Sequence, residues 1–262
     1  MKIPIIGLGT WNIGGGMVPD YSSDGEEVEA IQNAIRMGYT HIDTAQMYGA
    51  GHTEELVGRA IRHFKRHELF ITTKVWSTHL REPDVLREVE ASLRRLGLSY
   101  IDLLLIHWPN KAISLEETFR AFNRLISDGT VRYVGVSNFS VVQLEEAKRH
   151  SEVPIATNQV EYNLLHREPE LNGVLSYCQE SSILLTAYEP LGKGSILQHK
   201  GLKVLADRYS VTVAQLAIAW LLQKPKVITI PKSTKEAHLR ENLEVLNIAL
   251  PPQAFDDMNA LG

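Results

Sequence analysis

The feature that most limits the possible folds of this chain is a regular alternation of short apolar runs with longer helical stretches. The runs are rich in Ile, Val, Leu and Thr, which is typical of buried β-strands. They cover residues 3–9, 39–45, 69–75, 101–107, 131–137, 155–162, 183–190 and 226–231. The stretches with helical periodicity that follow them are 25–38, 53–64, 82–97, 114–129, 140–150, 168–181, 211–224 and 236–246. Strands that alternate with helices in this way pair in parallel.

Eight strand–helix units in 262 residues predict an α/β protein that closes into a (β/α)8 TIM barrel. We expect two extra short helices, one of them at 202–210. Barrels of this length are commonly single domains, and no linker or low-complexity tract divides the chain, so we expect one domain over residues 1–262. The alternative is a doubly wound sheet, which usually has fewer strands and a G-x-G-x-x-G turn. That turn is absent here, because Gly7 and Gly9 are followed by Thr10, Trp11 and Asn12.

The composition limits the possible partners. A net charge of −4 argues against a nucleic-acid or anionic-membrane surface. The single cysteine, Cys178, excludes an intrachain disulfide and fits a reducing compartment. No convincing signal peptide and no apolar segment of roughly 18 residues is present. We therefore expect a cytoplasmic monomer without nucleic-acid or membrane partners, and the lack of an H-E-x-x-H or cysteine cluster gives no support for a metal.

Polar side chains follow three consecutive strands at the point where each apolar run ends. Asp43 and Tyr48 follow the second strand, Lys74 ends the third and His107 ends the fourth. The carboxyl ends of parallel strands meet at one mouth of a barrel, where barrel enzymes carry their active sites. We therefore expect these four side chains to converge.

Together the four residues make chemical sense as a proton donor aimed at a carbonyl oxygen. A phenol titrates near pH 10, and a nearby ammonium lowers that pKa by stabilising the phenolate. An aspartate keeps the lysine charged, and a histidine bonds the substrate oxygen. Each residue alone has a structural alternative: Asp43 as a helix cap, Tyr48 as a packing aromatic, Lys74 as a solvated charge and His107 as a core histidine. Their common place at one end of the barrel favours catalysis.

Several segments resemble those of the aldo-keto reductase family, in the family's order and over nearly the whole chain. They are GLGTW, HIDTAQMYG, TTKVW, DLLLIHWP, VGVSNF, NQVEYN and IPKS. The resemblance implies a (β/α)8 barrel that reduces small aldehydes and ketones with NADPH, without a metal or flavin. It also implies that Asp43, Tyr48, Lys74 and His107 form the catalytic tetrad, with Tyr48 as the proton donor.

The same resemblance implies a cofactor site that draws on most of the barrel mouth. Ser137, Asn138 and Gln159 are expected to hold the nicotinamide carboxamide, and Tyr188 is expected to stack on the nicotinamide ring. Gly9, Thr10 and Trp11 are also expected to bind the cofactor. The loop from Leu191 to Ser195, which includes Lys193, is expected beside the pyrophosphate. Lys232 and Ser233 are expected at the 2′-phosphate, while Glu241 and Asn242 are expected at the adenine.

The chain departs from the family pattern at several points. His238 stands where the family commonly has an arginine as a second phosphate ligand, so NADH use is possible. Glu189 replaces a common serine and places an acid near the cofactor. The chain also lacks the C-terminal loop extension of longer members, which suggests an open mouth. Trp11, Trp76 and Trp108 follow three strands and are expected to form an aromatic substrate wall, with ordinary rim packing as the alternative.

The sequence leaves two other functions open. One is a cofactor-binding regulatory subunit with slow turnover, which the intact tetrad disfavours. The other is a barrel enzyme that forms a Schiff base on Lys74. That role is disfavoured because Asp43 would keep the lysine charged.

Overall fold

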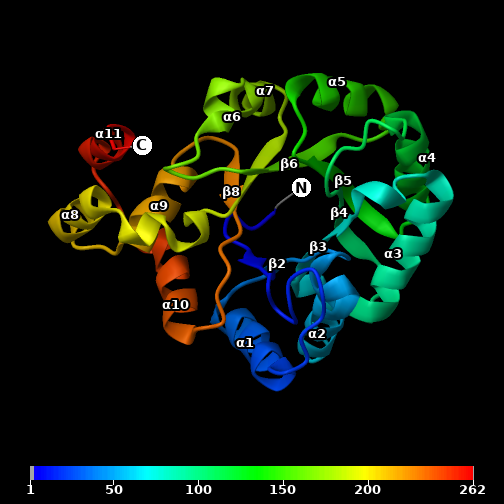
Figure 1. The fold of residues 1–262 in the computed structure, drawn as a ribbon, viewed down its shortest axis with the longest axis horizontal. Helices are drawn as coiled ribbons and strands as arrows, with labels where there is room; N and C mark the ends of the chain where they lie inside the picture. The colour runs from blue at the N-terminus through cyan, green and yellow to red at the C-terminus, as the bar shows by residue number, and fades with distance from the viewer. Residues whose placement is uncertain (1–2, 262) are drawn as a thin grey trace.

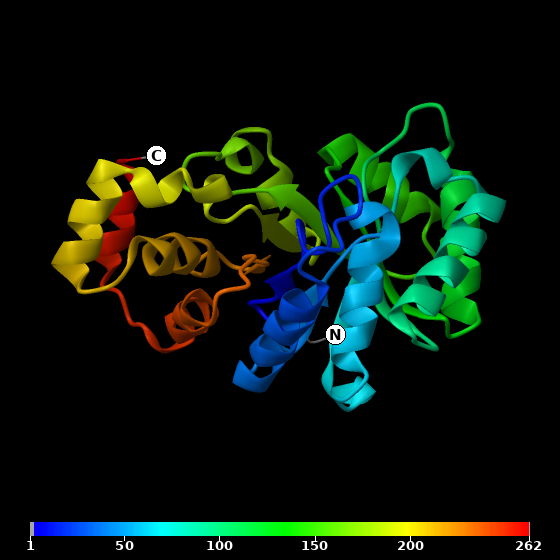
Figure 2. The same cartoon turned by 60° about the horizontal axis from the view of Figure 1, so that its bottom comes forward.

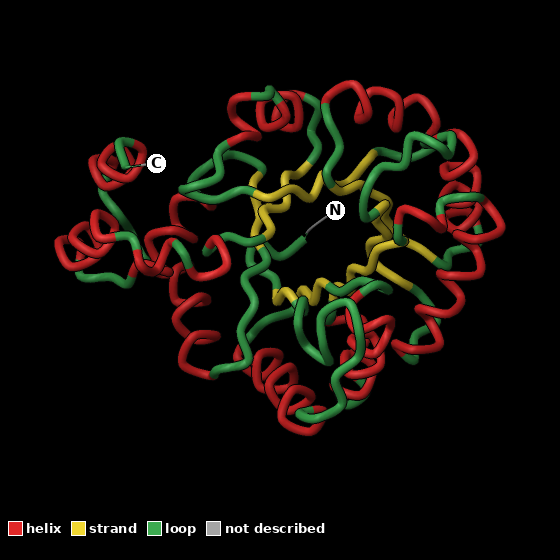
Figure 3. The backbone as a smooth tube through the Cα atoms, in the orientation of Figure 1, coloured by secondary structure: helices red, strands yellow, loops and turns green. Residues whose placement is uncertain are grey.

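The computed structural model describes residues 3–261, and its strands form one eight-stranded parallel sheet in the order β1 to β8. The strands are β1 (Leu8–Gly9), β2 (His41–Asp43), β3 (Phe70–Val75), β4 (Ile101–Ile106), β5 (Val131–Ser137), β6 (Ile155–Glu161), β7 (Leu184–Tyr188) and β8 (Val227–Thr229). Figure 1 and Figure 3 show them around a common axis, with the helices outside.

The first strand also meets the eighth, which closes the sheet. Ile6 and Thr229 form a parallel bridge. The Gly7 amide donates to the Thr229 carbonyl at 2.8 Å, and the Thr229 amide donates to the Ile5 carbonyl at 2.9 Å. The predicted (β/α)8 barrel is therefore confirmed.

The helices follow the predicted order with one split. They are α1 (Asp24–Met37), α2 (His52–Ile61), α3 (Glu82–Leu96), α4 (Leu115–Ser127), α5 (Val141–His150), α6 (Glu168–Leu171), α7 (Val174–Glu180), α8 (Lys200–Tyr209), α9 (Val213–Leu222), α10 (Glu236–Glu244) and α11 (Pro252–Asn259). The single helix predicted over 168–181 is wrong, because Gly173 takes a left-handed conformation with φ 80° and separates α6 from α7. The two extra helices are α8 and α11, which lie side by side in Figure 1 and Figure 2.

Helix ends follow from local chemistry. Ser140 and Gln143 form a capping box at the start of α5, as Thr212 and Gln215 do at the start of α9. Gly97 ends α3 in a left-handed conformation with φ 66°, where a side chain would be strained. No helix within residues 3–261 has the length and apolar character needed to cross a bilayer.

The interior of the barrel changes character along its axis. Near the amino ends of the strands it holds a small apolar cluster of Ile3, Phe70, Leu103, Leu105, Ala156 and Ile228. Residues two or four positions further along a strand point to the same side. Lys74 therefore follows Phe70 on the inner face of β3, and His107 follows Leu103 and Leu105 on the line of β4. The apolar cluster thus fills one end of the barrel, and polar side chains occupy the other.

Candidate active site

The four predicted catalytic residues come together at the carboxyl end of the barrel. Asp43 ends β2, Lys74 lies one residue before the end of β3, and His107 directly follows β4. Tyr48 opens a 3-10 turn, η1 (Tyr48–Gly51), that leads from β2 into α2. Asp43, Lys74 and His107 are buried, and the Tyr48 ring is half-buried at the mouth. The structure therefore brings together side chains from three neighbouring strands, as the sequence predicts.

The Lys74 ammonium is the hub of this arrangement. It donates to the Asp43 carboxylate, to the Thr44 carbonyl at 2.9 Å and to the Tyr48 hydroxyl at 3.3 Å. An ammonium has three donors, so all of them are in use. Because the Tyr48 oxygen accepts from Lys74, its own hydrogen is free for a group in the mouth.

Electrostatics keep Lys74 charged. Burial lowers the pKa of Lys74, but the attraction of Asp43 and the interaction with Tyr48 outweigh burial and raise the pKa above its ordinary value. A Schiff base requires the neutral amine, so this environment disfavours that chemistry.

The prediction that the pKa of Tyr48 is lowered is wrong, because the pKa is raised above its ordinary value. Burial raises the pKa of Tyr48. The charge of Lys74 and its hydrogen bond lower that pKa, but they do not offset burial, which Asp43 and Glu189 reinforce. Tyr48 therefore holds its proton at neutral pH, as a proton donor must.

His107 is a neutral imidazole between two aromatic rings. Burial lowers its pKa to about 2, and the charge of Lys74 acts in the same direction. The ring centroid lies 5.7 Å from that of Tyr48 and 5.1 Å from that of Trp76. Its Nδ1 is buried and has no hydrogen-bond partner among residues 3–261. A neutral imidazole carries one N–H, which suits hydrogen bonding to a carbonyl oxygen rather than donation of a proton to it.

The residues predicted to hold the carboxamide lie directly beside the tetrad. The Gln159 Nε2 donates to Asp43 Oδ2 at 2.8 Å, which leaves Oε1 as the acceptor for a ligand. Ser137 Oγ donates to the Gln159 carbonyl at 2.8 Å. Gln159 therefore links the amide cluster to the buried aspartate, a contact that sequence reasoning missed.

Asn138 and Tyr188 complete this cluster. The Asn138 Nδ2 donates to the His107 carbonyl at 3.2 Å and to Ser137 Oγ at 3.0 Å. The Tyr188 hydroxyl donates to Asn138 Oδ1 at 3.1 Å. Asn138 has a φ of 63°, a left-handed conformation that asparagine tolerates better than most residues. These bonds orient the amide beside the mouth.

The first strand brings its predicted residues close to Asp43 and Tyr48. A Cβ at Gly9 would lie 2.6 Å from the Ile230 carbonyl oxygen, so only glycine fits. The Thr10 Oγ1 donates to the Asp43 carbonyl at 2.9 Å, and Trp11 meets the Tyr48 ring edge-on at 4.9 Å between centroids. Trp11 and Trp76 therefore flank the tetrad, whereas Trp108 is 43% exposed.

The residues predicted around the distal cofactor gather on two segments. Leu191 and Lys193 follow β7, where Lys193 Nζ lies 3.1 Å from Glu189 Oε1. Lys232 and Ser233 follow β8, the first exposed and the second buried. Three members stand on α10, namely His238, Glu241 and Asn242. Their contacts with the pyrophosphate, the 2′-phosphate and the adenine stay predictions.

Gln46 is a further mouth residue that sequence reasoning missed. Its Oε1 accepts from the Trp76 amide at 2.9 Å, and its Nε2 donates to Glu88 at 2.9 Å. It thereby ties the loop between Asp43 and Tyr48 to the segment that carries Trp76. The available signal was its place inside the segment HIDTAQMYG.

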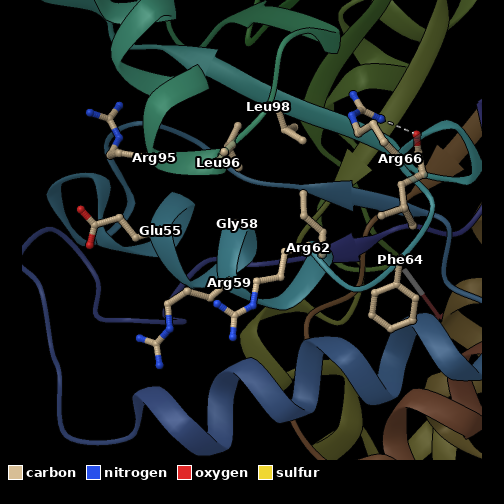
Figure 4. A pocket seen from close by; sticks show the side chains of 12 residues that line it. Glu55, Gly58, Arg59, Arg62, Phe64, Arg66, Arg95, Leu96 and Leu98 are labelled. Atoms are coloured by element: carbon tan, nitrogen blue, oxygen red, sulfur yellow. Dashed lines mark hydrogen bonds between the residues drawn. The ribbon is translucent and has the colours of Figure 1, made fainter.

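A groove of about 490 Å³ lies elsewhere, on the outer wall between α2 and α3 (Figure 4). Its lining includes Arg59, Arg66 and Arg95, which pair with Asp24, Asp102 and Glu54 respectively. No predicted site residue lines this groove. In the described part of the chain, no group of three or more His, Cys, Asp and Glu is placed to hold a metal.

A buried ammonium bound to a tyrosine hydroxyl, with a neutral histidine beside it, suits an oxidoreductase that acts on carbonyl groups. Comparison with known proteins agrees. The model of the Aldo/keto reductase family matches residues 5–262, and the chain belongs to this family. The predicted family and oxidoreductase class are thereby confirmed.

The chain also matches individual relatives over most of the length of each. Glyoxal reductase of Bacillus subtilis (strain 168) is 38% identical over 263 residues, which span 100% of this chain and 90% of the relative. The crystal structure of the thermostable aldo-keto reductase Tm1743 with the inhibitor epalrestat has a TM-score of 0.96 and 50% identity, covering 99% of this chain and 96% of that one. An aldo-keto reductase from Klebsiella pneumoniae in complex with NADPH has a TM-score of 0.91 and 36% identity, covering 99% and 91%.

Proposed function

We propose that this aldo-keto reductase reduces the carbonyl group of small aldehydes and ketones to an alcohol, with Tyr48 as the proton donor. Family membership and the NADPH complex of a relative support the use of NADPH. The observation that carries the residue roles is the Lys74 ammonium, which bonds the Asp43 carboxylate and the Tyr48 hydroxyl together.

The mouth fits a nicotinamide dinucleotide. Ser137, Asn138 and Gln159 gather amide and hydroxyl groups that match a carboxamide. The exposed Lys232 suits a phosphate at the far end. Bound NADPH supplies the hydride that the reduction requires.

In this proposal the protein supplies orientation and the proton. His107 donates its N–H to the carbonyl oxygen and holds it beside Tyr48. As negative charge develops on that oxygen, Tyr48 transfers its hydroxyl proton to it. Lys74, kept charged by Asp43, stabilises the phenolate that remains on Tyr48.

The substrates proposed are small aldehydes and apolar or aromatic carbonyl compounds. The relative named glyoxal reductase supports the first group. Trp11 and Trp76, which flank Tyr48 and His107, support the second group, since aromatic rings pack well against apolar substrates.

His238 bears on the choice of nucleotide. It is exposed on α10, six residues after Lys232. Histidine lacks the permanent charge and the bidentate fork with which arginine binds a phosphate, so we propose that NADPH is used but NADH is tolerated. We further propose that the chain is a cytoplasmic monomer of a single domain, and its one closed barrel supports the single domain.

The function is tested by NADPH oxidation across a panel that includes glyoxal, methylglyoxal and benzaldehyde, with wild type, Tyr48→Phe and the control Tyr209→Phe. Tyr209 bonds Asp257 between α8 and α11 and does not contact the tetrad. We expect turnover in wild type and the control, and a loss of about 10²- to 10⁴-fold in Tyr48→Phe. Binding of NADPH by a wild type without turnover on any aldehyde would instead favour a cofactor-binding regulatory subunit.

A further inference from the structure

The turn that carries Tyr48 has an unusual backbone. After Tyr48, Gly49, Ala50 and Gly51 all have positive φ, at 53°, 51° and 100°. Ala50 is the notable member, because a side chain in the left-handed region is uncommon and strained. Such conformations persist only where the surrounding structure fixes them. The residues that fix this turn therefore determine where Tyr48 lies.

Glu54, on α2 just after the turn, is a fully buried carboxylate with a donor on each oxygen. Its Oε1 accepts from Thr73 Oγ1 at 2.6 Å, and its Oε2 accepts from Arg95 Nε at 2.7 Å. Thr73 directly precedes Lys74, and alternation along β3 places these two side chains on opposite faces of the strand. Glu54 thus bonds β3 from outside the barrel, one residue from the lysine that bonds Tyr48 from inside.

Arg95 also packs against the turn itself. A Cβ at Gly51 would lie 2.9 Å from Arg95 Cδ, and a Cβ at Gly58 would lie 2.6 Å from the Arg95 carbonyl oxygen. Figure 4 shows Arg95 on α3 and Gly58 on the neighbouring α2. The ion pair with Glu54 therefore holds Arg95 where it supports Gly51.

A buried ion pair is a poor source of stability, because desolvation offsets most of the attraction between its charges. We expect this ion pair to matter because it fixes the positions of the groups that it joins. Within residues 3–261, the bond between Glu54 and Thr73 is the only side-chain hydrogen bond between α2 and β3. The elements that carry Tyr48 and Lys74 are thereby joined on the outer face of the barrel wall.

We propose that Glu54 is a positioning residue for Tyr48. By bonding Thr73 and Arg95, it fixes the turn against β3 and sets the 3.3 Å separation between the Tyr48 hydroxyl and Lys74 Nζ. This inference rests on the proposed role of Tyr48 as proton donor, and it adds a residue that touches neither the tetrad nor the mouth.

The test uses Glu54→Gln, which removes the charge but keeps the shape, and Thr73→Val, which removes one hydrogen bond. Asp102→Asn is the matched control. Asp102 is also a buried carboxylate, bonded by Arg66 at 2.5 Å, by Arg132 at 3.1 Å and by the Ile71 amide at 2.9 Å. It lies near the amino ends of β3 and β4, so its loss affects stability without touching the turn.

We expect Glu54→Gln to lower kcat about 10- to 100-fold, because small misplacements of a catalytic group have effects of that size. KM for the aldehyde and Kd for NADPH should stay within about twofold of wild type. The alkaline limb of kcat against pH should move up, since a looser contact with Lys74 lets the Tyr48 pKa rise. Thr73→Val should show a smaller loss in the same direction, and Asp102→Asn should lower Tm but not kcat.

Equal kcat losses in Glu54→Gln and Asp102→Asn, measured per folded molecule, would overturn the inference. An unchanged kcat in a folded Glu54→Gln would also overturn it. If Glu54→Gln does not fold, Thr73→Val decides by the same criteria. An inactive Tyr48→Phe beside a fully active Glu54→Gln would refute the positioning role alone, whereas an active Tyr48→Phe would refute the proposed function.

Discussion

Removing the Lys74 ammonium leaves a charge inside the barrel without its main partner. Lys74→Met keeps an unbranched side chain of similar length. The Asp43 carboxylate, 1% exposed, then retains, among the residues described, only Gln159 Nε2 as a side-chain donor. Breaking a buried pair by removing one member costs about 3–5 kcal/mol. We expect the free energy of unfolding to fall by that amount. At about 2–4 °C per kcal/mol for chains near this size, Tm should drop by roughly 6–20 °C.

A double-mutant cycle separates the unpaired charge from lost packing. Asp43→Asn added to Lys74→Met removes the remaining charge, and the amide still accepts from Gln159, so the double variant should be more stable than Lys74→Met alone. Lys65→Met is the surface control. Its ammonium is 72% exposed and lies 3.1 Å from Glu68, so its loss should change stability by less than about 1 kcal/mol.

The assay is urea unfolding at pH 7, followed by tryptophan fluorescence, for wild type, both single variants, the double variant and the surface control. A Lys74→Met protein within about 1 kcal/mol of wild type would refute the reasoning, because Asp43 could not then be a buried charge that needs its partner. A double variant less stable than Lys74→Met would refute it equally.

The remaining predictions concern two histidines. His52 is bonded by Asp24 at 2.8 Å and by Glu55 at 3.1 Å, and these carboxylates outweigh burial and raise its pKa above 6.5. Its ion pairs therefore stabilise the fold fully below pH 6.5, and this stabilisation is lost as pH rises through the raised pKa of the folded state. The free energy of unfolding in urea should fall with pH over this range, and His52→Gln should remove that dependence. An unaltered pH dependence in His52→Gln would contradict the prediction. His238→Arg should tighten Kd for NADPH relative to NADH, and an unchanged ratio in fluorescence titrations would contradict a phosphate contact at this position.

The fold and the convergence of the four polar side chains were predictable because their signals are local. Each strand keeps its apolar run until its carboxyl end, so Lys74 and His107 stand out as ionisable groups where apolar residues would be expected. Period two along β3 and β4 then places both on the inner face. Gly173 was equally visible in the sequence, but a glycine inside a helical pattern does not by itself predict that the helix ends there. For this reason α6 and α7 were predicted as one helix.

Other parts of the site could not be predicted, because they depend on burial and on contacts between residues far apart in the sequence. The bond from Gln159 to Asp43 joins residues 116 positions apart, across the barrel. The Thr44 carbonyl that accepts from Lys74 is a backbone group, which carries no sequence signal. The sign of the Tyr48 pKa shift depends on how far burial outweighs the attraction of Lys74, and only the folded arrangement sets that balance.

The central claim is that Tyr48 gives its proton to the carbonyl oxygen, with Lys74 beside it. A single-turnover experiment tests this most directly. Wild type or Tyr48→Phe, in excess over NADPH, is mixed with saturating methylglyoxal while absorbance at the nicotinamide band is recorded. We predict rapid oxidation in wild type, and in Tyr48→Phe a rate lower by about 10²- to 10⁴-fold with Kd for NADPH unchanged. A Tyr48→Phe protein that oxidises NADPH at the wild-type rate would contradict the account.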